Sequence, residues 1–524
     1  MATTTTGRPG VSVTETLNAL TSVNTPQEEA VAAFVGTHNA GPASPVKINS
    51  WSQWKALYEG FGSGNDLLPF AVYEYFNNGG GTAWIVRAVP ADATRATVVL
   101  NDLGTGGAGG TDPQPVLTLT AVAPGEAGNK LYIDITSGNG DTGRFTLNVR
   151  SGSAAATPVE RYVDVSLDPA DSRNLVAMIG AQGSGSQYLT AAYNGPEAWD
   201  YRFTPGAQSG TPLSGGQEGT AAVDLVAAAK LLSPSAVNSI LNVNLPGVSD
   251  ATVINPLIAW AEESGDRFMV VDAPAASSLY SDTLTAYTNL SPLGASTGTP
   301  LSKSSYVGVY GPWLNFRNPA SSVSGATRAL PPGGALLGLY ARADRDSGPQ
   351  QSAAGVDFPV NGAVSAQVAF ANADLDTLNQ LGINVIRTVP GANGLIPMGA
   401  RTLSSGMPDQ YIAIRRTLMQ VRRLCVQRTS FAVFRPNNQE LWDKISSILT
   451  DELSTLQQSG VLRGATASEA FFVRCDETNN TENTVSNGIV NIEVGVSLNT
   501  PSEYIIIQIG QMASGATSDD TLAS

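Results

Sequence analysis

Few residues of this chain have the types and spacing that catalysis requires. The only histidine of the sequence, His38, has no cysteine near it that could complete a zinc site, and no nucleophile pattern surrounds it. The glycine-rich stretch 104–110 superficially matches a dinucleotide-binding fingerprint. That fingerprint needs a strand before it and a helix N-terminus after it, whereas this stretch follows no good strand and leads into Pro113 and Pro115. We interpret His38 as a polar loop residue and 104–110 as a linker, and we expect no cofactor.

Three carboxylates are further candidates for chemistry. Asp272 ends a predicted buried strand, the position at which open α/β sheets bind ligands. Asp344 and Asp346 lie close together, and paired carboxylates can bind a metal or act as acid and base. The simpler interpretations are a helix cap for Asp272 and ion pairs with Arg342 or Arg345 for the other two. A hydrolase or nucleotide-binding protein with Asp272 as a site residue stays open as an alternative, although the sequence as a whole favours a protein without enzymatic activity.

The composition indicates several domains and excludes some classes of partner. A chain of 524 residues is too long for one ordinary core, so we expect about two to four domains. Only 14% of residues are charged, which fits either a surface buried in a larger object or a polar surface rich in Thr, Ser and Asn. The net charge of −15 argues against non-specific nucleic-acid binding, which requires a basic face. Without a signal peptide or a run of eighteen apolar residues, no direct membrane insertion is expected. Cys425 and Cys475 are expected to be buried free thiols.

A cluster of arginines on one predicted helix runs against the net negative charge. The helix spans 411–428, and no Asp or Glu occurs between positions 410 and 439. Four of its arginines flank an apolar stripe: Arg415, Arg416, Arg422 and Arg423. They form either a solvated face that pairs with acids elsewhere or a docking face for an acidic partner surface.

The periodicity of the chain predicts a multidomain α/β and α+β fold. Residues 30–89 form a β-α-α-β block, and short strands of period two lie between 116 and 165. Helices and strands alternate from 220 onward, which indicates a largely parallel sheet. The predicted core module is built from the N- and C-terminal segments 23–100 and 380–510. It carries an inserted small β-sandwich or barrel domain at 101–205 and an inserted α/β domain at 216–379.

The C-terminal segment has clear local signals. Residues 431–434 are predicted as a strand, and Asn437 with Glu440 as a capping box at the start of a helix. The apolar residues of that helix recur at helical spacing and are expected to face inward: Leu441, Ile445, Leu449, Leu453 and Leu456.

Strand-forming segments at both chain ends are the most informative feature. Tyr504 and four isoleucines fall within six residues, and Val11 and Val13 alternate with polar residues. Strands at both ends are well placed to pair with other chains, which favours an assembly protein over an enzyme. We expect an N-terminal arm at 1–22, a flexible tail at 511–524, and the inter-subunit arm residues Pro9, Gly10, Val11, Val13, Tyr504, Ile505, Ile506, Ile507 and Ile509.

Several short segments, taken in order, resemble the contractile tail sheath proteins of bacteriophages. The matches bracket residues 9–90 and 380–510. They comprise Pro9-Gly10-Val11-Ser12-Val13, 34–42, 78–87, 382–387, 399–404, Phe434-Arg435-Pro436-Asn437 with Leu441-Trp442, and 464–466 with 471–476. The stretch 101–205 carries no recognisable motif of this kind, and sheath proteins often carry such decorations on their outer surface. Sheaths of bacterial contractile injection systems would look alike here and stay open as the alternative.

The resemblance implies a structural role. Subunits of this family form hexameric rings that stack helically around an inner tube, and contraction drives the tube through a cell envelope. Terminal arms exchanged between neighbours connect the array, and the four arginines are the candidate tube-facing residues. The implied partners are further copies of the chain, the inner tail tube protein, and baseplate and tail terminator proteins. The implied location is the virion tail, after synthesis in the bacterial host cytoplasm.

Overall fold

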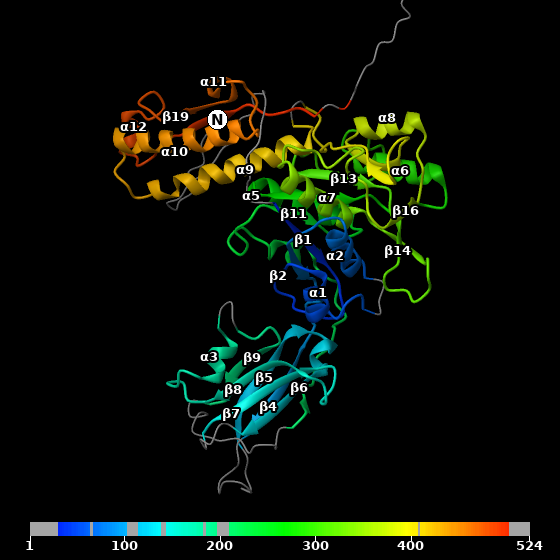
Figure 1. Ribbon diagram of the computed structural model, residues 1–524, viewed down its shortest axis with the longest axis vertical. Coiled ribbons are helices and arrows are strands. Elements are labelled where there is room, and N and C mark those ends of the chain that lie inside the picture. The colour runs from blue at the N-terminus through cyan, green and yellow to red at the C-terminus, as the bar shows by residue number, and fades with distance from the viewer. Residues whose placement is uncertain are drawn as a thin grey trace, which may run out of the picture. The chain divides into compact units, whose positions relative to one another are not determined.

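A computed structural model describes most of the chain (Figure 1). The described residues fall into two compact units, 30–435 and 436–503. They are residues 30–62, 66–101, 114–137, 143–181, 185–195, 209–406, 409–501 and 503.

The larger unit is built on an eight-stranded sheet. Six central strands run parallel, and the two outermost strands, β18 and β2, pair antiparallel with their neighbours. The residues of β11, β12 and β13 are buried throughout, as a parallel sheet covered on both faces requires. Across the sheet the strands are β18 (Leu395–Pro397), β17 (Ile383–Thr388), β13 (Val307–Gly311), β12 (Arg267–Asp272), β11 (Leu241–Asn244), β1 (Val31–Gly36), β3 (Ala83–Arg87) and β2 (Val46–Ile48).

This sheet confirms a mixed α/β fold but crosses the predicted domain limits. β1 lies in the predicted core segment 23–100, yet it pairs with β11 of the predicted insertion 216–379. β17, from the predicted segment 380–510, pairs with β13 of the same insertion. The prediction of a separate α/β domain at 216–379 therefore does not match the sheet. The physical reason is that the backbone groups of a buried strand need hydrogen-bonding partners on both sides, and β1 finds them in β3 on one side and β11 on the other.

Helices cover the sheet in the manner of a doubly wound fold. The chain runs from β1 to β3 in one direction and from β11 through β17 in the other. α2 (Leu68–Asn77) packs on α7 (Gly333–Asp346), and α4 (Leu225–Lys230) packs on α5 (Ala251–Ser264). The other elements here are α1 (Trp51–Tyr58), α6 (Tyr280–Leu290), α8 (Asn372–Gln380) and a small antiparallel sheet of β15 (Thr327–Leu330), β14 (Leu314–Arg317) and β16 (Ala363–Ala366).

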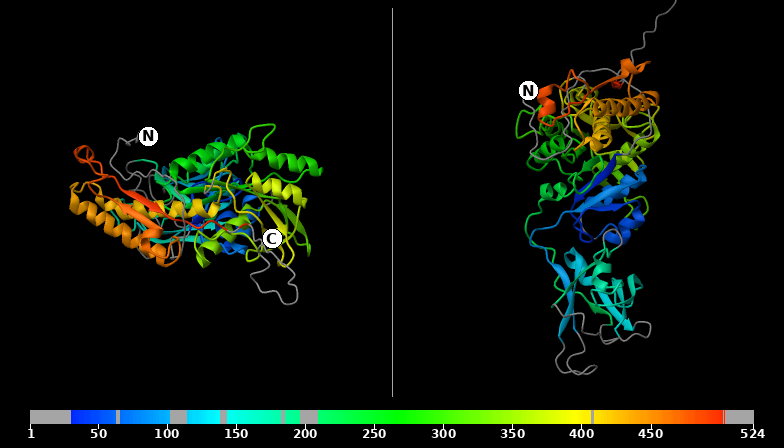
Figure 2. Two further views of the ribbon diagram at one scale, coloured as in Figure 1. Left: turned by 90° about the horizontal axis from the view of Figure 1, so that it is seen from above. Right: turned by 90° about the vertical axis from the view of Figure 1, so that its left-hand side faces the viewer.

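Residues 95–213 form two antiparallel sheets with a hydrophobic core of their own, the β domain (Figure 2). One sheet has the order β4 (Arg95–Asn101), β5 (Pro115–Pro124) and β9 (Leu189–Tyr193). The other has the order β10 (Thr211–Pro212), β6 (Leu131–Ser137), β7 (Phe145–Ser151) and β8 (Pro158–Val165). A 3₁₀ helix, η1 (Glu126–Lys130), and the short α3 (Leu175–Ile179) complete it.

The larger unit ends with a long helix and the smaller unit begins after it. α9 (Ile412–Thr429) is followed by a 3₁₀ turn, η3 (Ser430–Ala432). The predicted strand at 431–434 is wrong, because Phe434 adopts a left-handed backbone with φ of 65° that a strand does not allow. The smaller unit contains α10 (Gln439–Gln458), α11 (Ala467–Ala470), β19 (Phe471–Arg474), α12 (Glu482–Ser486) and β20 (Glu493–Val496).

The predicted inward stripe of α10 is confirmed, since all five of its residues are buried. The predicted capping residue is wrong by one position. Asn438 is the N-cap, and its side chain accepts a hydrogen bond from Leu441 N. Asn437 instead accepts from Trp442 Nε1 at 2.8 Å and donates to the Ile489 carbonyl oxygen at 2.9 Å. The capping box of this unit lies at Thr466 and Glu469 of α11.

Two glycines bring α7 into backbone contact with α2. A Cβ atom at Gly334 would lie 2.3 Å from the carbonyl oxygen of Ala71, and one at Gly338 would lie 2.5 Å from that of Tyr75. No side chain fits at either position unless the helices move apart. The pairing of α2 with α7 therefore depends on these two glycines.

Replacing Gly338 by Ala should lower the free energy of unfolding by about 1–3 kcal/mol, because overpacking forces a backbone shift. Urea denaturation followed by circular dichroism measures this change. Gly81→Ala is the matched control, since a Cβ atom there meets nothing within 4 Å. Equal effects of the two substitutions would contradict this account of the helix pair.

Candidate functional site

The nine predicted arm residues lie outside the described part of the chain. The described residues do contain a surface that could receive a strand. β19 and β20 form an antiparallel sheet of two strands, and neither has another strand as neighbour among the described residues. A sheet of two strands is marginal on its own and is stabilised by further strands or by a helix.

The register of this sheet determines which backbone groups face outward. Ser497 N donates to Ala470 O at 2.8 Å, so this pair is hydrogen-bonded. Because bonded and non-bonded pairs alternate in an antiparallel ladder, the N–H and C=O groups of Val494 and Val496 point away from β19. On the β19 side, the N–H of Phe471 already donates to Ala467 O. The outer edge of β20 is therefore the more open of the two.

The two faces of the sheet differ in character. One face carries Phe471, which is buried, on the strand that packs against α10. On the other face, the ring of Phe472 lies over Gly495 and is 48% exposed. Arg474 and Glu493 form an exposed ion pair of 2.9 Å beside it. An added strand would thus extend a sheet that already has a supported face.

The structure places the first of the four predicted tube-facing arginines in the interior. Arg415 is 3% exposed, and its Nη2 lies 2.8 Å from Asp409 Oδ1. Its guanidinium lies over the ring of Tyr306, 4.6 Å from the centroid. Asp409 lies one position before the stretch 410–439, which contains no Asp or Glu.

Arg416 is buried in the same way by α7. It pairs with Asp344, whose side chain is 2% exposed, and its guanidinium lies over the ring of Tyr340 at 4.6 Å. The Tyr340 hydroxyl is 2.6 Å from the Tyr310 hydroxyl at the end of β13. Removing one partner of such a buried pair leaves an uncompensated charge, so these contacts fix α9 to the sheet.

The other two arginines are half-buried and bind backbone groups. Arg422 Nη1 donates to the Ser264 carbonyl oxygen at 2.8 Å, at the C-terminus of α5 where the helix dipole favours a cation. Arg423 donates to the carbonyl oxygen of Asn238 at 2.6 Å and to its side chain at 3.2 Å. The first half of α9 thus belongs to the core, and only the second half reaches the surface.

Asp272 occupies the position at the end of β12 where a ligand was considered. Its Oδ2 accepts from Gly247 N and from the Asn244 side chain, both at 3.0 Å. Its Oδ1 accepts from Gly333 N, at the first turn of α7, at 2.7 Å. Burial outweighs these hydrogen bonds and raises the pKa of Asp272 to about 6. The carboxylate thus takes the place that an anionic ligand would have at this helix N-terminus, in agreement with the interpretation as a helix cap.

The other candidates for chemistry are also engaged in packing. His38 is 4% exposed rather than a surface loop residue, with Nε2 2.6 Å from the Tyr58 carbonyl oxygen. Asp346 pairs with Arg345 as predicted, at 3.6 Å, whereas Asp344 pairs with Arg416. The described residues contain no group of three or more His, Cys, Asp or Glu placed to hold a metal ion. No helix among them is long and apolar enough to cross a bilayer.

The fold can be compared with known structures. No protein-family profile and no curated protein sequence matches the chain. Solved structures do match it over nearly its whole length. The sheath complex of an extracellular contractile injection system, PVC, in its contracted state covers 98% of this chain and is covered completely, with a TM-score of 0.54 and 18% identity. The contracted helical sheath of the anti-feeding prophage covers 97% of this chain and is also covered completely, with a TM-score of 0.53 and 21% identity.

The fold is that of a contractile sheath protein. A crystal structure of the sheath tail protein Lin1278 from Listeria innocua agrees, with a TM-score of 0.57 and 14% identity over 87% of this chain and 90% of its own. The resemblance of the short sequence motifs is thereby confirmed at the level of the fold. At 97% and 98% of the chain, the matches to the two contracted sheaths extend over both units.

Asp272→Asn should lower the free energy of unfolding by about 1–3 kcal/mol, because an amide NH₂ would face one of the three donors.

The raised pKa of Asp272 makes this loss of stability depend on pH. The native state binds the Asp272 proton more tightly than the unfolded state, so the contribution of Asp272 is largest below about pH 4 and falls as the pH rises towards 6. The stability difference between native protein and variant should follow this trend in urea denaturation between pH 4 and 8. A difference that grows with rising pH would contradict this assignment.

Proposed function

We propose that this chain is the subunit of a contractile tail sheath. It polymerises as helically stacked hexameric rings around an inner tube and contracts to drive the tube through a cell envelope. The observation that carries the proposal is the match to two contracted sheaths over 97% and 98% of the chain. The protein acts by assembly rather than by catalysis, which the internal hydrogen bonding of Asp272 supports.

The contact that connects copies is strand exchange at the β19–β20 sheet. The edge of β20 offers the backbone groups of Val494 and Val496, and the arms 1–22 and 503–510 have the composition of strands. A donated strand of about five residues forms roughly four hydrogen bonds, each worth about 0.5–1.5 kcal/mol. Each buried Ile adds about 1.5–3 kcal/mol. Such a contact is more stable than an exposed ion pair, which contributes about 0–1 kcal/mol. The strand contact can therefore persist while exposed ion pairs between subunits break.

The partners follow from this role. Further copies of the chain and the baseplate are the first, because anti-feeding prophage structures with this fold include the sheath and the baseplate. The inner tail tube protein and the tail terminator protein complete the set. Of the four arginines predicted to face the tube, Arg422 and Arg423 remain candidates, whereas Arg415 and Arg416 are too buried to touch it. The β domain would be a decoration on the outer surface.

A sheath of a bacterial contractile injection system is the second candidate function. Two of the three matches described above come from an injection system and a prophage of the anti-feeding type. The same subunit geometry serves a phage tail. Capsid genes or toxin-loading genes beside this one would separate the two, and the virion tail is the expected location only in the first case.

Val494→Pro should abolish assembly of the purified protein into sheath polymers seen by negative-stain electron microscopy. Proline removes an outward-facing N–H of β20 and leaves the ladder to β19 intact. Val494→Thr, which keeps the N–H and the branched shape, is the control and should assemble normally. On the donating side, Val11→Pro with Val13→Pro should give the same loss. Full-length polymers from either proline variant would rule out strand exchange at the site concerned.

Arg422→Gln combined with Arg423→Gln should weaken binding to the tube several-fold in co-sedimentation, because the charge is lost while side-chain donors remain for the carbonyl oxygens of Ser264 and Asn238. The melting temperature should change by no more than a few degrees. Arg161→Gln combined with Arg173→Gln, at two exposed arginines of the β domain, is the control for the same change in net charge. Unchanged tube binding would remove α9 from the tube interface.

A further inference from the structure

The β domain is joined to the rest of its unit by two connections, which pair with each other. Thr94 N donates to Gln217 O at 2.9 Å, and Thr97 N donates to Ser214 O at 2.8 Å. Asp92, on the first connection, accepts from the backbone N–H groups of Thr220 and Ala221 on the second. The two connections therefore form one ribbon rather than two independent linkers.

A buried arginine lies where this ribbon meets the large sheet. Arg87 is the last residue of β3, and its side chain is 0% exposed. Its guanidinium donates to the carbonyl oxygens of His38 at 2.6 Å and Gly41 at 2.9 Å, in the loop after β1. It also donates to the Pro124 carbonyl oxygen, at the end of β5, at 2.8 Å, and to Glu218 Oε2 at 2.9 Å. One side chain thus joins the core loop, the β domain and the second connection.

Glu218 extends this network. Its other carboxylate oxygen accepts from Glu126 N, at the start of η1, at 3.0 Å. The planar fork of an arginine suits such a site, because five N–H groups in fixed directions can satisfy several acceptors at once. A lysine has no such fork.

We propose that Arg87 is a clamp that holds the β domain to the α/β core, so that the two move as one body. The clamp acts in the single chain, so the proposal stands apart from the proposed sheath function. In an assembly of many copies, the clamp would make the β domain move together with the core. Without the clamp, the β domain could swing on its connections.

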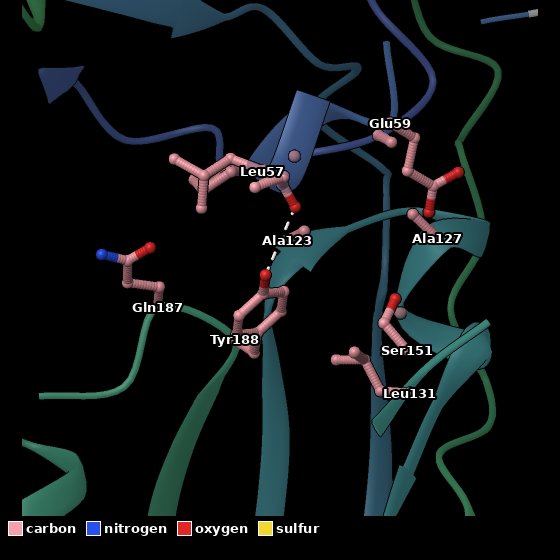
Figure 3. A pocket seen from close by; sticks show the side chains of 13 residues that line it. Leu57, Glu59, Ala123, Ala127, Leu131, Ser151, Gln187 and Tyr188 are labelled. Atoms are coloured by element: carbon pink, nitrogen blue, oxygen red, sulfur yellow. Dashed lines mark hydrogen bonds between the residues drawn. The ribbon is translucent and has the colours of Figure 1, made fainter. Parts of the chain in front are cut away.

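Weaker contacts accompany the clamp across a narrow cleft between α1 and the β domain (Figure 3). The Tyr188 hydroxyl donates to the Ala56 carbonyl oxygen at 3.3 Å. Lys130 pairs with Glu59 at 2.9 Å, but both side chains are about half exposed, and surface pairs of this kind contribute little. The cleft has a volume of about 40 Å³, which suits a water molecule rather than a ligand. These contacts cannot replace a buried four-acceptor site.

Spin labels on either side of the junction test the clamp. We suggest Ser153→Cys in the β domain and Asp376→Cys on α8, both exposed, in a Cys425→Ser background. Double electron–electron resonance then measures the width of the distance distribution between them. Arg87→Met, which keeps the length and apolar body but removes every donor, should broaden this distribution at least twofold. Glu218→Ala removes one acceptor and should broaden it less.

Glu59→Ala is the matched control, since it removes the exposed ion pair at the same junction and should leave the width unchanged. If Arg87→Met does not fold, Glu218→Ala decides the matter, because Glu218 is partly exposed and the Arg87 guanidinium keeps its three carbonyl acceptors when Glu218 is lost. Hydrogen exchange at the Glu126 amide should rise in Glu218→Ala as well. A native width in a folded Arg87→Met variant, or in Glu218→Ala when the first is unfolded, would overturn the proposal.

Discussion

Backbone hydrogen bonding at sheet edges is the constraint on which the rest of this structure depends. The large sheet ends on both sides in a three-residue antiparallel strand, β2 and β18, and Pro397 stands in the second of them. Short edges with proline do not invite further strands. In the small sheet, no described strand pairs with the outer edge of β20, where Val494 and Val496 present their backbone groups. Among the described residues, the large sheet thus has short edges that discourage pairing, and the small sheet has an edge with outward-facing backbone groups.

Buried charged side chains hold the elements of the larger unit together. Arg87 joins the β domain to the core, Arg416 joins α9 to α7, and Arg267 donates to carbonyl oxygens of Leu232, Val237 and Ser239. Asp272 holds the start of α7 through Gly333. Buried ions of this kind cost desolvation and are retained where removing one partner would be worse. Asp272 and Asp344, two of the carboxylates that suggested chemistry in the sequence, are thus internal cross-links between elements.

Much of the fold could be predicted because its signals are local. The stripe from Leu441 to Leu456 follows from helical spacing, and the parallel strands follow from alternation with helices. The division into domains could not be predicted, because the pairing of β1 with β11 links residues about 200 positions apart and has no local signature. The prediction that Arg416 faces the tube failed for the same reason. Asp344 lies 72 residues before Arg416, so a window without acids gave no sign of it.

The chain connects the two units through α9, and this connection gives a reason for the firm attachment of α9 to the larger unit. A load taken up at the β20 edge of the smaller unit and passed along the chain to the large sheet runs through residues 436 to 412. Phe434, left-handed and 89% exposed, lies at this boundary and offers little packing to resist a pull. The first strong attachment along the path is the buried start of α9, where Arg415 and Arg416 pair with Asp409 and Asp344. Ion pairs of a buried guanidinium that lies over an aromatic ring are harder to open than surface contacts, because opening them leaves the charge unpaired in an apolar site. Placing them at this helix, rather than on a docking face, is what a subunit needs if its neighbours hold it by a strand.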